Sequence, residues 1–162
     1  MSLERFLAAH SGRKVPREWE DQLLTLTRPV VYVTLDDAQA YCEWVGGRLP
    51  NEEEWEIAAR GLSGRKYPWG TETPDECRVD LGNPSGTQTP VGMFPAGDAP
   101  EGISDMAGNV WEWTGSDYSQ ERKVVRGFSY WLDTSALRGA VRSYNEPAFR
   151  DGNVGFRCLR ED

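Results

Sequence analysis

The alternation of hydrophobic and polar positions predicts a few short helices and strands joined by long polar connections. From Leu3 to Ala9, apolar side chains recur three and four residues apart, which predicts a helix. Pro29 to Val33 is rich in β-branched residues and predicts a strand. The glycine- and proline-rich stretch 63–102 has neither period and predicts a long loop. Further strand-like runs lie at 123–130, 137–142 and 154–160.

Two longer helices begin at recognisable N-caps. Thr34 and Asp37 have the spacing of a capping box, in which each side chain binds the backbone N–H of the other residue. Asn51 and Glu54 repeat this spacing, and glycines follow both helices, as is common at helix ends. The glutamates of the second helix predict a solvated face and a cap rather than a catalytic cluster. Residues 13–21 are polar, and their lone tryptophan is expected to dock this arm onto the core.

Residues 102–114 are the most distinctive stretch of the chain. A polar turn bracketed by glycines leads into a run in which two tryptophans alternate with other residues. This period predicts a strand with the tryptophans on one face and Glu112 on the other. Asp105 and Asn109 place oxygen atoms in the turn, which suits a hard cation such as Ca²⁺. The same residues also suit a turn in which the aspartate binds its own backbone, and the spacing leaves both interpretations open.

Composition and charge exclude several classes of protein. With 162 residues the chain fits one domain, 1–162, and seven tryptophans suggest loops packed by aromatic anchors. A net charge of −8 repels phosphate backbones, so no nucleic-acid partner is expected. No apolar run has the length of a membrane span, and nothing at the start resembles a signal peptide. We therefore expect no membrane insertion and, by default, a cytoplasmic location, with surface display if the chain belongs to a longer protein.

The cysteine content is odd and scattered. Cys42, Cys77 and Cys158 form no CxxC pair, which argues against a disulfide scaffold, fits a reducing compartment and leaves room for one disulfide. Cys42 lies on the apolar face of its predicted helix and is expected to act as a small buried hydrophobic residue. Cys77, in a polar loop, is expected to be the exposed thiol.

Seven motifs occur in a fixed order between about residues 29 and 160. They are Pro29-Val30-Val31 with Asp37-Ala38-x-x-Tyr41-Cys42-x-Trp44, Arg48-Leu49-Pro50-x-Glu52-x-Glu54-Trp55-Glu56-x-Ala58-Ala59-Arg60-Gly61, Tyr67-Pro68-Trp69-Gly70, Thr89-Pro90-Val91-Gly92, Asp105-Met106-Ala107-Gly108-Asn109-Val110-Trp111-Glu112-Trp113, Arg126-Gly127 and Gly155-Phe156-Arg157-Cys158. In this order they resemble the formylglycine-generating enzyme family, also called the sulfatase-modifying-factor family. The resemblance implies an α+β fold of the C-type lectin type, with a small twisted antiparallel sheet, two helices and extensive ordered loops.

The resemblance also implies a structural calcium ion. Carried over to this chain, its ligands are the side chains of Asp105 and Glu112 with the carbonyls of Gly108 and Val110. The ion would clamp the long loop against the strand that carries the tryptophans. Of a second calcium site in the family, only Asn83 remains here.

The chain departs from the family where catalysis would take place. Enzymes of the family carry two active-site cysteines that bind copper after the Arg-Gly motif, and the corresponding residues 126–137 contain no cysteine. Cu(I) requires soft sulfur ligands. Related ergothioneine-pathway enzymes hold iron with several histidines, whereas this chain has only His10. We therefore expect neither copper nor iron and interpret the chain as non-catalytic.

The segment 128–153 has instead the composition of a binding surface. It mixes rigid aromatic residues with short polar ones, as paratopes do. This layout is similar to the variable proteins of diversity-generating retroelements, which place a diversified surface at this position of the same fold. The ligand would be a protein or another macromolecule, and the oligomeric state is left open. The candidate ligand-binding residues are Phe128, Tyr130, Trp131, Leu132, Asp133, Thr134, Ser135, Ser143, Tyr144, Asn145, Phe149, Asp151 and Asn153.

Two alternatives remain at this point. The segment is also compatible with an ordinary surface loop of a degenerate family member, an oxidoreductase domain that has lost its catalytic cysteines. An enzyme that uses tyrosine and carboxylate groups would need paired carboxylates or a nucleophile–base spacing, and the sequence offers neither.

Overall fold

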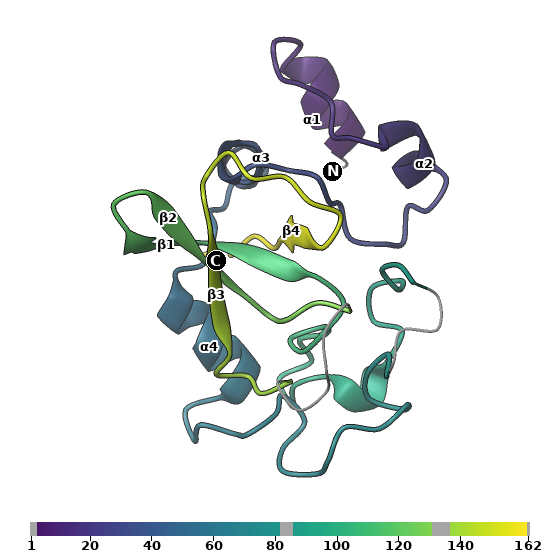
Figure 1. Cartoon of the computed structure of the whole chain (residues 1–162), viewed down its shortest axis with the longest axis vertical. Helices are drawn as coiled ribbons and strands as arrows, with labels where there is room; N and C mark the ends of the chain where they lie inside the picture. The colour runs from purple at the N-terminus through teal and green to yellow at the C-terminus, as the bar shows by residue number, and fades with distance from the viewer. Residues whose placement is uncertain (1–2, 82–85, 131–136, 162) are drawn as a thin grey trace.

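A four-stranded sheet lies at the centre of the residues that the computed structural model describes, 3–81, 86–130 and 137–161 (Figure 1). Its strands are β1 (Trp111–Ser119), β2 (Arg122–Arg126), β3 (Arg142–Asn145) and β4 (Val154–Phe156), in the spatial order β3-β2-β1-β4. The pairs β1–β2 and β2–β3 are antiparallel, whereas β4 runs parallel to β1. The α+β class is thus confirmed, but the sheet is mixed rather than wholly antiparallel.

Four α-helices occur in the described part of the chain. They are α1 (Leu3–Ala9), α2 (Trp19–Leu23), α3 (Leu35–Trp44) and α4 (Glu52–Arg60), and a single 3₁₀ turn, η1, covers Pro95–Gly97. The helices α3 and α4 are the two longer ones expected from the sequence. The short helix α2 begins near the end of the polar arm, 13–21, that the sequence suggested. None of these helices is both long and apolar enough to cross a lipid bilayer.

Both predicted capping boxes are present. The Thr34 hydroxyl accepts from the Asp37 N–H at 3.1 Å, and the Thr34 N–H donates to the Asp37 carboxylate at 3.1 Å. In α4 the Asn51 side chain accepts from the Glu54 N–H at 2.8 Å, while the Asn51 N–H donates to Glu54 at 2.7 Å. These reciprocal bonds satisfy N–H groups that the first turn of a helix leaves without partners, so local sequence alone sets where both helices begin.

Two strand predictions are wrong. Pro29–Val33 is not a strand because Tyr32 adopts a left-handed backbone with φ 58°, which interrupts an extended run. Its valines nevertheless enter the core, since Val31 and Val33 are buried. The prediction for 137–142 is also wrong, because strand β3 begins only at Arg142.

The core lies on both faces of β1. Trp113 is fully buried, and its indole N–H donates to the Val33 carbonyl at 3.1 Å. The opposite face meets α4, whose Trp55 packs with Ala59 and Met106 in a second apolar cluster. The alternation in β1 therefore places the residues where the sequence predicted.

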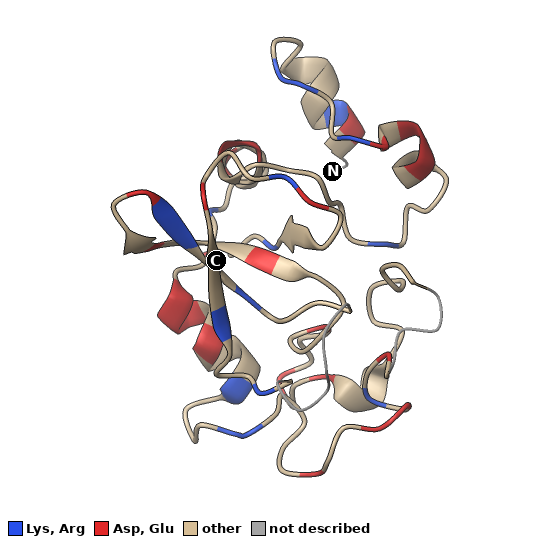
Figure 2. Ribbon diagram, in the orientation of Figure 1, with Lys and Arg blue, Asp and Glu red and all other residues tan. Residues whose placement is uncertain are grey.

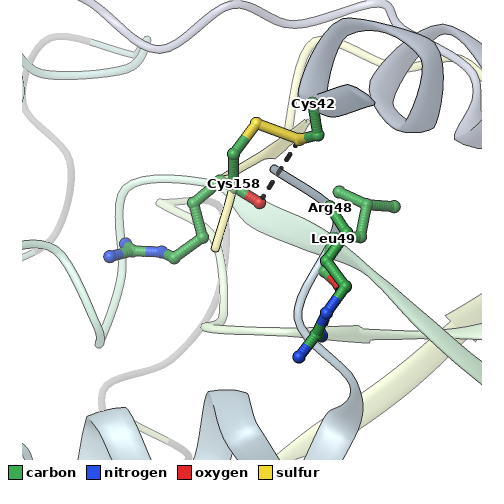
Figure 3. Close-up of a disulfide and its surroundings, with 5 residues drawn as sticks. Cys42, Arg48, Leu49 and Cys158 are labelled. Atoms are coloured by element: carbon green, nitrogen blue, oxygen red, sulfur yellow. Dashed lines mark hydrogen bonds between the residues drawn. A yellow bond between two sulfur atoms is a disulfide. The ribbon is translucent and has the colours of Figure 1, made fainter. Parts of the chain in front are cut away.

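A disulfide joins α3 to the C-terminal end of the chain (Figure 3). Cys42 and Cys158 are 116 residues apart in sequence, with their Cα atoms at 5.3 Å. It is the one disulfide that the sequence left open, and it corrects the expectation of Cys42 as a plain hydrophobic residue. Spacing along the sequence gave no sign of the pairing, because the contact is made by α3 and the segment after β4. Cys77 is free and exposed, as expected.

Low pH is expected to destabilise the first turn of α4, because it protonates the Glu54 carboxylate. The pKa of this carboxyl is lowered from 4.5 to about 2, because the Arg48 guanidinium binds both of its oxygens and the Asn51 N–H donates to it. A depressed folded-state pKa stabilises the fold above the unfolded value, and this contribution is lost as pH falls from about 4.5 to about 2. We expect Glu54→Gln to flatten the acid limb of the stability profile measured by urea denaturation. Glu53→Gln, one residue away and exposed, should leave that limb unchanged.

Candidate functional site

The turn before β1 is fixed by unusual backbone conformations and by one asparagine. Asp105, Gly108 and Asn109 all have positive φ, at 57°, 91° and 65°. The Asn109 side chain accepts from the Thr89 N–H and donates to the Thr89 carbonyl, both at 3.2 Å. This two-way contact ties the long loop to the turn.

The Glu112 carboxylate is buried and fully engaged. It accepts from the Trp55 indole N–H at 2.7 Å and from two nitrogens of Arg157, at 2.6 and 2.7 Å. Arg157 also donates to the Ser104 carbonyl at 3.1 Å. Burial acts to lower the pKa of Arg157, but the Glu112 carboxylate outweighs this effect and the net direction is upward. The ion pair therefore joins α4, the turn, β1 and the end of β4.

The four residues assigned to calcium do not form an open oxygen cage in this arrangement. Calcium takes six to eight oxygen ligands, and the Glu112 oxygens already face the guanidinium of Arg157. The Asp105 carboxylate accepts from the Gly92 N–H at 2.8 Å. Across 3–81, 86–130 and 137–161, no group of three or more His, Cys, Asp or Glu side chains is placed to hold a metal. The side chains as placed thus fit an internal arginine better than an ion, and calcium stays a prediction.

Asp105 offers a direct test of the calcium prediction. Burial raises the pKa of Asp105, and the Gly92 N–H and the Arg157 cation offset this only in part. A raised folded-state pKa favours the fold at low pH, and this contribution is lost as pH rises through that value, so the carboxylate destabilises the neutral-pH fold.

We therefore expect Asp105→Asn to raise the urea midpoint at pH 7 in the presence of chelator, since asparagine tolerates positive φ and can still accept from Gly92. The Asp98→Asn variant is the matched control, because it changes the nearby charge without entering the turn. A wild-type midpoint that calcium raises, and that Asp105→Asn makes insensitive to calcium, would instead establish an ion at this motif.

A buried cation, Arg126, holds part of the segment proposed to bind a ligand. The Arg126 side chain is 1% exposed and lies beside Glu52 and Glu56 of α4, with its nitrogen 2.7 Å from Glu56. It also donates to the carbonyls of Gly139 and Ala140, at 3.0 and 3.1 Å. Burial lowers the pKa of Arg126, and the two glutamates counteract this. The guanidinium stacks on Trp55 at 5.3 Å, which links this network to Glu112.

The structure separates the candidate ligand-binding residues into different environments. Phe128 is corrected from surface to core: it is 4% exposed, contacts the Trp111 ring and has φ 71°. Tyr130 is half-buried, and its N–H donates to the Asn109 carbonyl at 3.2 Å. Five candidates fall outside the described residues: Trp131, Leu132, Asp133, Thr134 and Ser135.

The remaining candidates lie on β3 and in the loop after it. Tyr144 and Phe149 are exposed, at 39% and 40%, whereas Ser143 and Asn145 are partly buried on the same strand. Asp151 and Asn153 are involved in holding the loop. The Asp151 carbonyl accepts from the Tyr32 N–H at 3.0 Å, and the Asn153 carbonyl accepts from the Trp111 N–H at 2.8 Å.

Sequence reasoning missed two residues that extend this surface. Tyr118 of β1 stacks on Tyr144 with ring centroids 4.2 Å apart, and Arg122 of β2 lies 4.7 Å from the Tyr144 centroid. Both lie outside the segment 128–153. Their signal in the sequence was an aromatic residue and an arginine in an otherwise polar hairpin, which does not by itself reveal a partner on a different strand.

Comparison with known proteins identifies the family. The family model described as a sulfatase-modifying factor enzyme 1-like domain matches residues 10–162. The chain therefore belongs to this family, and the resemblance seen in the ordered motifs is confirmed.

Particular relatives include both inactive proteins and enzymes. The inactive Cα-formylglycine-generating enzyme 2 of Bos taurus is 41% identical over 158 residues, which cover 80% of this chain and 49% of the relative. The hercynine oxygenase of Mycobacterium tuberculosis is 35% identical over 182 residues, which cover 91% of this chain and 43% of the relative. The chain thus spans about half the length of the curated relatives it matches.

A solved structure shares the fold. Treponema denticola variable protein 1 superposes with a TM-score of 0.63 at 20% identity, covering 80% of this chain and 70% of that chain. This likeness concerns the arrangement of the backbone, and it agrees with the fold class inferred from the motifs.

Proposed function

We propose that the protein is a non-catalytic ligand-binding domain that presents a surface near its C terminus, in the manner of a retroelement variable protein. The observation that carries the proposal is the exposure of Tyr144 and Phe149, on β3 and in the loop after it, beside a segment held by a buried network. Large exposed aromatic side chains on a rigid framework give contact area at a low entropic cost on binding.

The framework supports this proposal because it anchors the surface through the main chain. Arg126 binds the carbonyls of residues 139 and 140, and the Asp151 and Asn153 carbonyls accept from the N–H groups of Tyr32 and Trp111. Side chains between these anchors are left to contact a ligand. The fold shared with a variable protein is compatible with this role.

The absence of catalysis is supported by the sequence after Arg126 and by one group of relatives. Residues 126–137 contain no cysteine, and a relative at 41% identity is named as inactive. Calcium, where it binds, would serve stability and take no part in a reaction.

The disulfide favours a cellular location different from the cytoplasm expected by default from the sequence. Persistent disulfides belong to oxidising environments, so a chain that contains the Cys42–Cys158 bond fits display outside the cytosol better than the cytoplasmic default. A protein or another macromolecule then remains the expected partner.

Genomic sequencing tests the proposal. We expect the DNA downstream of the gene to contain a near-repeat of the region that encodes residues 128–156, differing mainly at adenines, followed by a reverse transcriptase. If no such repeat is present, the proposal fails in favour of a domain derived from an oxidase, and titration of the protein with copper and iron becomes the next measurement.

A further inference from the structure

Four side chains from three strands form an exposed stack at one end of the sheet. We call this set the tyrosine–arginine stack: Tyr118 of β1, Arg122 of β2, and Arg142 and Tyr144 of β3. The Tyr118 and Tyr144 rings lie 4.2 Å apart at an interplanar angle of 26°. Arg122 lies over Tyr144 at 4.7 Å, and Arg142 lies over Tyr118 at 5.3 Å. Both tyrosines are exposed, at 46% and 39%, so the stack belongs to the surface and not to the core.

The register of the sheet explains why these residues meet. Tyr144 pairs with Val124 and Arg142 with Arg126, so Tyr144, Arg142 and the side chains of Val124 and Arg126 share one face. Glu112 pairs with Arg126 and continues that face onto β1. Further along β1, the Ser116 hydroxyl accepts from the Glu52 N–H, at the start of α4, at 2.9 Å. The helix α4 covers this face as far as its own N-terminus. The stack occupies the part of the face beyond it.

The stack presents hydrogen-bond donors to solvent. Each tyrosine ring has the other ring on one side and an arginine close by, and both tyrosines and both arginines are exposed residues whose hydroxyl and guanidinium groups can donate. Arg142 is 49% exposed and is 3.2 Å from Glu52. Arg122 has no carboxylate partner among the described residues, whereas the adjacent Lys123 is paired with Asp117 at 2.7 Å. Figure 2 shows basic residues, coloured blue, along the ribbons of β2 and β3, in a chain whose net charge is −8.

We infer that the tyrosine–arginine stack is part of the binding surface and recognises an acidic segment of a polypeptide partner. This inference rests on the proposed function and adds to it the β1–β2 hairpin and the chemistry of the partner. A guanidinium presents its donors in a planar fork that matches a carboxylate, and the contacts of Arg122 and Arg142 with the tyrosine rings restrict where that fork can lie. Tyrosine and arginine are also the residue types enriched at energetic centres of protein interfaces.

Two other partners fit the stack less well. Nucleic acid carries a phosphate at every nucleotide, and a chain with net charge −8 repels this continuous line of charge more strongly than the few carboxylates of a short acidic segment. A neutral glycan binds by stacking on open aromatic faces, and the inner faces of these two rings are closed by their contact with each other. A polypeptide carboxylate needs only the donors that the stack exposes.

Selection of random linear peptides displayed on phage tests the inference with the folded protein as bait. We expect enriched peptides to be acidic and to bind the Arg122→Ala and Tyr118→Ala variants at least about tenfold more weakly than the wild type. Arg17→Ala is the matched control, because Arg17 lies 5.9 Å from the Tyr32 ring in a similar cation–π contact on the N-terminal arm. Circular dichroism of each variant confirms that it is folded.

The outcomes separate this inference from the function on which it rests. Peptides that lose binding with Tyr144→Ala and Phe149→Ala, but not with Arg122→Ala or Tyr118→Ala, would overturn the stack while keeping the proposed function. Neutral or basic peptides that depend on the stack would overturn the acidic partner. Binders insensitive to all four variants, or a selection without any binder, would count against both the surface and the function.

Discussion

Loss of the Cys42–Cys158 disulfide is expected to lower the free energy of unfolding by about 4–5 kcal/mol, because the bond closes a loop of more than a hundred residues and restricts the unfolded chain. Such a loss is comparable to the whole stability of many domains. The measurement is guanidinium denaturation of the wild type with and without a thiol reductant, followed by tryptophan fluorescence. The double variant Cys42→Ala, Cys158→Ala should reproduce the effect of the reductant.

The third cysteine supplies the control. Cys77 is free and exposed, so the Cys77→Ser variant should have the same denaturation midpoint as the wild type, both with and without the reductant. If the reductant lowers the free energy of unfolding of the wild type by less than about 1 kcal/mol, the structural role given to the disulfide is contradicted. A shift of the Cys77→Ser variant would point to an intermolecular bond instead.

The substitution Glu112→Gln is expected to destabilise the fold by about 3–5 kcal/mol. Glutamine keeps the size of the side chain but removes its charge, and it turns an N–H donor toward the donors of Arg157 and Trp55. The guanidinium, 28% exposed, would then lack its counter-charge at a site it cannot easily leave. Because Arg157 also donates to the Ser104 carbonyl, amide hydrogen exchange in the turn 102–110 should speed up more than in β2.

A double variant separates the charge effect from packing. Glu112→Met combined with Arg157→Met removes both members of the pair, and a buried ion pair replaced by apolar groups is often neutral in stability. We therefore expect the double variant to be more stable than Glu112→Gln alone. Equal destabilisation in both would show that the carboxylate acts through its bond with Trp55 rather than by holding the arginine.

Local signals in the sequence predicted the elements that depend on local contacts. The capping boxes at Thr34 and Asn51 formed as expected, because each uses residues three positions apart. The alternation around Glu112 also predicted its face correctly, since strand geometry sets the side on which a residue lies. The family followed from the order of motifs, which is itself a property of the sequence.

Features decided by distant contacts could not be predicted in this way. Tyr32 interrupts an apparent strand, and its N–H is bound by the Asp151 carbonyl, a contact between residues far apart in sequence. Phe128 looks like an exposed aromatic residue until β1 places Trp111 against it. Tyr118 gains its significance only because the strand order β3-β2-β1 brings Tyr144 beside it. Each case needs the sheet before the residue can be interpreted.

The hydrogen bonds that Arg126 makes to the main chain affect how the sequence around residues 139 and 140 can change during evolution. Its guanidinium binds the main-chain carbonyls of Gly139 and Ala140, and every amino acid supplies such a carbonyl. Gly139 itself is constrained, since a Cβ there would lie 2.7 Å from the Cγ of Arg60. At Ala140, by contrast, a mutation changes the side chain without removing the group that anchors it. A lineage can therefore accumulate new side chains around this anchor and test them for binding, while the gene continues to encode the same fold.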